Sequence, residues 1–286
     1  MSESTVVTLA RDDGAHPATV EVDIEQGGRL AQITVGGHRL LIDDDASRGK
    51  PSHWGAFPQA PWTNRIRNGH FTLFGVEHTL ETNHVDHPAH GPEQHHAIHG
   101  TVYARPWTVL DASTTTVTAS CPIDTRLGWP FPGTATHRVT LGRHAVRCEL
   151  SVSFDGPADG GNEPLAMPAE VGWHPWFVKP THLDFDPVAM YAKDDTDMFI
   201  GELVEPSAGP WDDCFVCVEP ITLHYDREIA ARVAISSDCD HWIVFDKPEA
   251  ATCVEPQSGP PDAVAIRPRL ITADRPLRRH MRIGWD

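Results

Sequence analysis

Short runs of alternating apolar and polar residues, each bounded by turn residues, constrain the fold of this 286-residue chain more than any other feature. Alternation sends successive side chains to opposite faces of an extended strand, so each run predicts a strand with one buried face. The sequence has no helical pattern of useful length. The runs are residues 19–24, 30–35, 70–74, 117–121, 137–141, 146–154, 233–236 and 241–245. The sequence therefore predicts an all-β protein.

Turn signals that contain glycine join these runs in pairs. They stand at residues 26–28, 36–37, 74–75 and 142–143, where a few residues separate one run from the next, as in antiparallel hairpins. The 22 glycines and 25 prolines suit a protein with many tight turns. Residues 156–164 are rich in Gly and Pro, but strand-like runs resume beyond them, so we expect a surface loop there. Residues 1–286 are expected to form a single domain, a large antiparallel β-sandwich.

The charge balance excludes one class of partner. Forty acidic residues against 23 Lys and Arg give a formal net charge of −17. Nucleic-acid binders neutralise phosphates with dense basic segments, and this sequence has none. No apolar run approaches the roughly 20 residues that span a bilayer, and the acidic N-terminus does not resemble a secretory signal. We expect a cytoplasmic monomer or homodimer that acts on a small molecule, with no nucleic-acid or membrane partner.

The cysteines point to free thiols. Six of them are scattered along a chain without a secretory signal, which disfavours a disulfide framework. Cys214 and Cys217 form a CxxC pair, but no second pair completes a zinc site and the flanking residues are strand-like. We expect no function for this pair.

One candidate site residue is Arg65, which stands beside Asn64 in a polar turn before a strand. A guanidinium can donate two parallel hydrogen bonds to vicinal hydroxyls or to a carboxylate. The alternative is a solvated loop arginine.

Three histidines lie within five positions, at His95, His96 and His99. Histidine titrates near neutral pH and is also a common metal ligand. In an extended segment His95 and His99 would share one face and His96 would point away, so the group fits a three-histidine metal site poorly. We expect no metal here.

His174 lies between two tryptophans in the segment 171–177. Indole faces suit the apolar face of a sugar ring, although such aromatic clusters are also common in cores. Trp176 is favoured over Trp173 as the sugar-stacking residue, because in an extended segment Trp176 shares a face with His174.

Glu255 follows an apolar run and precedes a rigid proline turn, as a positioned base would; the alternative is an ordinary exposed glutamate.

Taken together and in this order, these segments resemble the aldose 1-epimerase (galactose mutarotase-like) family. The resemblance extends from Arg65 to Asp262 and therefore covers most of the chain. It is carried by NRI at 64–66, GHF at 69–71, HG at 99–100, GWHPWF at 172–177, DDCF at 212–215, EP at 255–256 and GPPDA at 259–263.

The resemblance implies a single large antiparallel β-sandwich, a supersandwich, with a carbohydrate cleft and no metal or cofactor. It implies that Glu255 is the general base, His174 the general acid and His99 a second contact to the ring oxygen. By the same resemblance Arg65 and Asp212 position the sugar, with Asn64 in the same motif as Arg65. Whether Asp212 or the adjacent Asp213 contacts the sugar stays open.

The implied reaction is the interconversion of α and β anomers of a hexose such as glucose or galactose. It requires an ionised glutamate to take the O1 proton while a protonated imidazole gives one to the ring oxygen. A hexose-6-phosphate mutarotase is the nearest alternative, and it would need two cations, of which Arg67 is one candidate. A non-catalytic carbohydrate-binding protein would need neither acid nor base. A glycosidase could pair Glu255 with Asp212, but His174 would then have no role.

Overall fold

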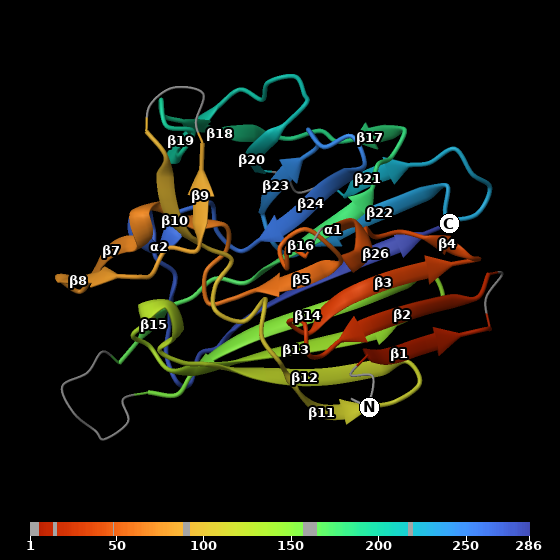
Figure 1. The fold of residues 1–286 in the computed structure, drawn as a ribbon, viewed down its shortest axis with the longest axis horizontal. Helices are drawn as coiled ribbons and strands as arrows, with labels where there is room; N and C mark the ends of the chain where they lie inside the picture. The colour runs from red at the N-terminus through yellow and green to blue at the C-terminus, as the bar shows by residue number, and fades with distance from the viewer. Residues whose placement is uncertain (1–5, 14–15, 48, 88–91, 157–164, 217–219) are drawn as a thin grey trace.

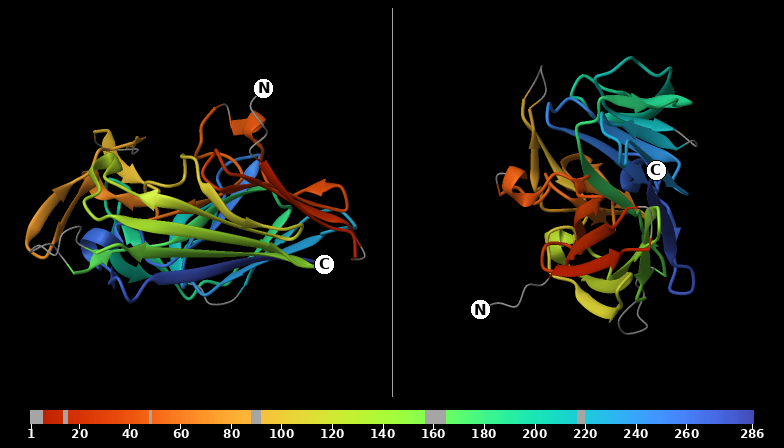
Figure 2. Two further views of the ribbon diagram at one scale, coloured as in Figure 1. Left: turned by 90° about the horizontal axis from the view of Figure 1, so that it is seen from below. Right: turned by 90° about the vertical axis from the view of Figure 1, so that its right-hand side faces the viewer.

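Most of the strands belong to two large antiparallel β-sheets, which stack as the layers of a sandwich (Figures 1 and 2). The computed structural model describes residues 6–13, 16–47, 49–87, 92–156, 165–216 and 220–286. In spatial order, the 11-stranded sheet contains β1 (Val6–Arg11), β2 (Ala18–Asp23), β3 (Arg29–Val35), β5 (Ala56–Gln59), β16 (Gly172–Val178), β24 (Ala251–Gln257), β23 (His241–Phe245), β20 (Asp212–Val216), β18 (Ala189–Lys193) and β19 (Phe199–Val204), with β4 (His38–Arg39) paired to β3.

The 8-stranded sheet forms the second layer. In spatial order it contains β11 (Thr108–Ala112), β12 (Thr116–Ile123), β13 (Gly133–Leu141), β14 (Ala145–Phe154), β26 (Leu277–Trp285), β22 (Arg232–Ser237), β21 (Ile221–His224) and β17 (His182–Asp184). Alternate residues of its long central strands are buried, as in β13 and β14. Leu150 of this sheet and Ile33 of the first belong to one hydrophobic core, because the inner faces of both sheets contribute side chains to it.

Smaller elements lie outside the two sheets. A three-stranded sheet contains β6 (Arg65–Ile66), β10 (Gln94–Ile98) and β9 (His84–Asp86), and two further pairs are β7 (His70–Leu73) with β8 (Val76–Thr79) and β15 (Met167–Pro168) with β25 (Leu270–Ile271). The helices of the described residues are single turns, namely α1 (Asp44–Ser47), α2 (Ala263–Ile266), η1 (Arg67–Gly69) and η2 (Arg126–Gly128). Among the described residues, no helix is long and apolar enough to cross a membrane.

The predicted all-β architecture and the predicted hairpins are confirmed. Each predicted strand lies within or overlaps an observed one, and the four turn signals connect paired neighbours such as β2–β3 and β13–β14. Phe74 and Gly75 both adopt positive φ, at 53° and 78°, which matches the twist that a two-residue hairpin turn requires. Most of the predicted surface loop at 156–164, and Cys217 of the CxxC pair, lie outside the described residues.

The strands β5, β16 and β24 are neighbours in the 11-stranded sheet and are buried on both faces. The register pairs Gly172 with Gln257 and Trp176 with Cys253, which brings His174 level with Glu255. Trp173 points the other way and is fully buried in the main core, where its Nε1 lies 3.2 Å from His137 Nε2. The alternation along β16 therefore gives one face to the core and the other to the candidate site.

Candidate active site

A cavity of about 250 Å³ lies over the side of β16 that carries His174. Residues from distant parts of the sequence line it, because the antiparallel pairing brings β24 and β20 toward β16 while the small sheet supplies Arg65. All seven residues that the sequence analysis proposed for the site are among them: Asn64, Arg65, His99, His174, Trp176, Asp212 and Glu255.

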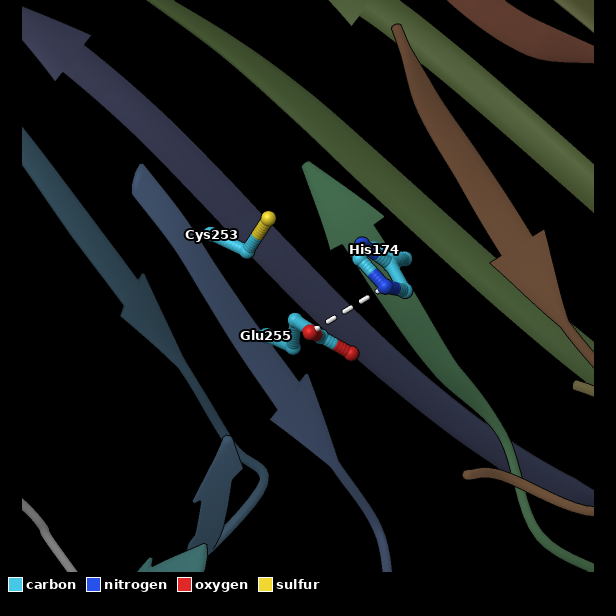
Figure 3. A group of neighbouring side chains, drawn as sticks. All are labelled: His174, Cys253 and Glu255. Carbon is cyan, nitrogen blue, oxygen red and sulfur yellow. Dashed lines mark ion pairs between the residues drawn. The ribbon is translucent and has the colours of Figure 1, made fainter. Parts of the chain in front are cut away.

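His174 and Glu255 form a buried pair, with Nε2 of His174 3.3 Å from Oε1 of Glu255 (Figure 3). Burial lowers the pKa of His174 to about 3, and the neighbouring His53 adds to this effect. Burial also raises the pKa of Glu255 well above its usual range, and Asp212 raises it further. These two shifts favour a neutral imidazole beside a protonated carboxyl group, which differs from the ionised glutamate and protonated histidine expected from sequence. Desolvation, which penalises both charges, accounts for the difference.

Two buried glutamines hold the other carboxyl oxygen of Glu255. Gln257 Nε2 donates to Oε2 at 3.2 Å, and Gln59 Nε2 donates to the same oxygen at 3.4 Å. Both glutamines are fully buried. Because the amide donors are on Oε2, Oε1 is the oxygen that faces His174.

His99 reaches the cavity because the chain leaves the extended conformation directly after β10 ends at Ile98. Its φ of 63° lies in the left-handed region, and its backbone N–H donates to Asn64 O at 2.9 Å. The prediction that His95 and His99 share a face is therefore wrong: His95 is exposed, whereas His96 and His99 are buried. The regular alternation of an extended segment ends before His99. The ring of His99 stands at 87° to that of His174, with 5.1 Å between centroids.

Arg65 is held by an aspartate that the sequence analysis did not identify. Its Nε and Nη2 donate to the two carboxylate oxygens of Asp86 at 2.6 and 3.2 Å, and its Nη1 donates to Asn64 Oδ1 at 3.0 Å. This two-point pair fixes the plane of the guanidinium at the cavity wall. Asp212 also lines the cavity, whereas Asp213 Oδ1 lies 3.0 Å from Lys193 Nζ.

Trp176 packs against histidines on the cavity wall. Its indole is stacked on the ring of His174, with centroids 5.4 Å apart, and on that of His53 at 5.2 Å. Its Nε1 donates to Ser52 O at 2.9 Å, which fixes the indole in place. The rings of His174 and His53 thus cover part of the Trp176 indole that the sequence analysis expected to stack on a sugar ring.

One group among the described residues has the composition of a metal site. His174, Cys253 and Glu255 each offer a ligand atom, and these atoms lie within 4.8 Å of one another (Figure 3). Cys253 packs in an apolar cluster with Phe57, Trp176 and Ala251, and burial raises the pKa of its thiol well above the usual range. A metal ion would have to displace this thiol proton and would occupy the His174–Glu255 pair.

A family model described as aldose 1-epimerase matches residues 14–205, which is about two thirds of the chain. The chain belongs to the aldose 1-epimerase family. This is a family of carbohydrate epimerases. The matched segment contains Asn64, Arg65, His99, His174 and Trp176, and ends before Asp212 and Glu255.

A curated relative matches over 169 residues. The chain is 29% identical over that length to the uncharacterized protein YihR of Escherichia coli (strain K12). The match covers 59% of this chain and 49% of that protein, so it spans about half the length of the relative.

Solved structures of other aldose 1-epimerase-like proteins share the fold along almost the whole chain. A GalM/aldose epimerase homologue from C. elegans superposes with a TM-score of 0.78 at 15% identity, covering 98% of each chain. A putative aldose 1-epimerase from Escherichia coli K12 gives a TM-score of 0.76 at 16% identity, covering 98% of this chain and 100% of that one. These likenesses show the galactose mutarotase-like fold, and at such identities they show the fold alone.

Sequence analysis missed three further groups at the candidate site, namely Gln59, Asp86 and Gln257. Gln59 ends a short strand that is buried on both faces, so no alternation marks it. Asp86 stands in the edge strand β9 and is remote in sequence from Arg65. Gln257 had a usable signal, because it lies two residues after Glu255 on a strand and therefore shares its face.

Proposed function

We propose that this protein catalyses the interconversion of α and β anomers of an uncharged hexose such as glucose or galactose. Family membership supports the class of reaction. The observation that carries the proposal is the contact of His174 with Glu255 inside a cavity that also contains hydroxyl-binding groups. Arg65 offers donors and Asp212 offers acceptors for sugar hydroxyls.

In the proposed reaction the pair of His174 and Glu255 gives one proton to the sugar and takes another from it, so the pair holds one proton before and after the step. In the reactive form Glu255 is ionised and His174 is protonated. Glu255 takes the proton of the C1 hydroxyl while His174 gives its proton to the ring oxygen, the bond between C1 and that oxygen breaks, and an open-chain aldehyde forms. Rotation about the C1–C2 bond presents the other face of the aldehyde, and the reverse transfers close the ring.

The total charge on His174 and Glu255 is zero both before and after the ring opens. Before ring opening the pair is carboxylate and imidazolium, and afterwards it is carboxylic acid and neutral imidazole. Because His174 and Glu255 together hold one proton in both stages, the buried cavity never has to hold a net charge on these two groups. Polar sugar hydroxyls stabilise the ionised form when the substrate is bound, and the Arg65 guanidinium favours the carboxylate of Glu255.

The charges near Asp212 favour an uncharged sugar over a phosphorylated one. The Lys and Arg residues that line this cavity and the one that shares Arg65 and Asp212 with it each lie within 4.0 Å of an aspartate, in the pairs Arg65–Asp86, Lys193–Asp213 and Lys247–Asp212. Arg67, the cation considered for the phosphate alternative, is paired with Asp194. A phosphate dianion would need cations that are not already compensated. This balance supports the mutarotase of free hexoses over the hexose-6-phosphate alternative.

Polarimetry tests the proposal. Freshly dissolved α-D-glucose and α-D-galactose are followed with the wild-type protein, with Glu255→Gln and with buffer alone. We expect the wild type to reach the spontaneous final rotation faster, and Glu255→Gln to follow the buffer rate. As a matched control, Glu228→Gln alters an exposed glutamate and should behave as wild type. Sugar binding without faster mutarotation would instead indicate a non-catalytic carbohydrate-binding protein.

A further inference from the structure

Gln59 has a defined amide orientation, because one of its neighbours can only donate. The backbone N–H of Asn64 lies 2.8 Å from Gln59 Oε1. If the amide were reversed, two donors would face each other at this distance, so the oxygen must be on this side. The opposite end of the amide then donates to Glu255 Oε2, which is consistent with the same orientation.

This orientation determines the tautomer of His99. Nδ1 of His99 lies 2.9 Å from the same Gln59 Oε1, and an amide oxygen only accepts hydrogen bonds. The proton of the neutral ring must therefore be on Nδ1. Burial lowers the pKa of His99 well below its usual range, and the nearby His174 acts in the same direction, so the ring is neutral near pH 7.

We propose that Gln59 is a positioning residue that fixes His99 with a bare Nε2 available to the substrate and at the same time orients the carboxyl group of Glu255. His99 lines the cavity and its Nδ1 is engaged, so Nε2 is the nitrogen left for a ligand. A bare Nε2 accepts a hydrogen bond from a sugar hydroxyl. It cannot bind the ring oxygen, which itself only accepts.

This inference changes the role that the resemblance implied for His99. The sequence analysis expected His99 to contact the ring oxygen, a role that needs a donor. In the inferred arrangement His174 alone delivers a proton to the ring oxygen, and His99 orients a hydroxyl. That part of the inference rests on the proposed function, whereas the tautomer and its dependence on Gln59 do not.

The direct test is nitrogen-15 NMR of the histidine ring in the full-length protein, with the signal assigned by its loss in His99→Asn. In the wild type between pH 6 and 8 we expect a proton on Nδ1 and none on Nε2. In Gln59→Met, which has similar length and no polar end, we expect the Nδ1–H form to lose its dominance. Gln257→Met is the matched control, because Gln257 also donates to Glu255 Oε2, while among the described residues no hydrogen bond joins it to His99. It should leave the His99 signal unchanged.

A wild-type His99 with its proton on Nε2 would overturn the inference, as would a ring signal that is identical in Gln59→Met. The wild-type measurement needs no variant to fold. Activity gives a second readout: Gln59→Met should lose about tenfold or more in kcat/KM for the sugar, as expected for a lost buried hydrogen bond. If the protein has no mutarotase activity, the tautomer result still stands by itself, so the two failures are distinguishable.

Discussion

The imidazole of His174 and the carboxyl group of Glu255 face each other across the adjacent strands β16 and β24, with Nε2 3.3 Å from Oε1. A direct contact between a proposed acid and a proposed base makes them a single proton-holding unit. The unit is buried, and its strands are central to the sheet, so its geometry is fixed by the fold.

The two groups should act as one unit in catalysis. Either Glu255→Gln or His174→Asn should lower kcat by about 10²- to 10⁴-fold, which is typical of a lost acid or base. The kcat of the double variant should be only slightly lower than that of the less active single variant, since each change already removes the shared proton transfer. Polarimetry of the three variants gives the comparison. Losses that multiply in the double variant would show that the two groups act independently.

The pH dependence should be broad. The one-proton state is lost only when His174 is protonated beside a protonated Glu255, near its lowered pKa of about 3, or when Glu255 ionises beside a neutral His174, at its raised pKa. We therefore expect kcat/KM to stay level as the pH rises from about 5 through about 6.5, where an ordinary histidine loses its proton. The enzymatic rate is obtained at each pH by subtracting the rate with Glu255→Gln. A decline of tenfold per unit above about pH 6.5 would instead indicate a histidine with an ordinary pKa.

Asp86 should control sugar affinity through Arg65. Asp86→Asn removes the charge that holds the guanidinium by two hydrogen bonds, so Arg65 loses its fixed plane. We expect KM to rise about tenfold, with a smaller change in kcat, because Arg65 is proposed to bind hydroxyls throughout the reaction. Asp184→Asn, an exposed aspartate, is the control. An unchanged KM for Asp86→Asn would contradict the role of Asp86 in positioning Arg65 for sugar binding.

Glu170 should make stability depend on pH. Its carboxyl group is buried, and it accepts hydrogen bonds from the N–H and hydroxyl of Thr63 at 3.2 Å. Burial raises its pKa to about 8, so the folded state retains a proton that the unfolded chain loses above about pH 4.3. The resulting stability is complete below pH 4.3 and is lost as the pH rises toward 8, at about 1.4 kcal/mol per unit.

Calorimetry of the wild type and Glu170→Gln at pH 5 and pH 8 measures this effect. The Tm of the wild type should fall relative to that of Glu170→Gln by several degrees over this range. The glutamine keeps an oxygen for Thr63 and has no proton to lose. A Tm difference that is the same at both pH values would contradict a raised pKa for Glu170.

The sequence predicted the strands and hairpins well because the alternation of apolar and polar residues within a short segment shows directly which face of a strand is buried. The runs at 137–141 and 146–154 became the adjacent strands β13 and β14 for that reason. Local patterns carry no information about which distant strands become neighbours, so the position of β5 beside β16 was not predicted. Gln59 was missed for the same reason, since its role exists only once Asn64, His99 and Glu255 surround it. The prediction that His95 and His99 share one face was wrong because His99 leaves the extended conformation.

The most direct test of the central claim is NMR saturation transfer between the anomeric protons of glucose or galactose at equilibrium. Irradiation of the α-anomer signal should reduce the β-anomer signal in the presence of the wild-type protein, because the His174–Glu255 pair opens and closes the ring. The same experiment with Glu255→Gln should show no transfer above that in buffer. Equal transfer with the wild type and with Glu255→Gln would contradict the account, as would sugar binding by the wild type without any transfer.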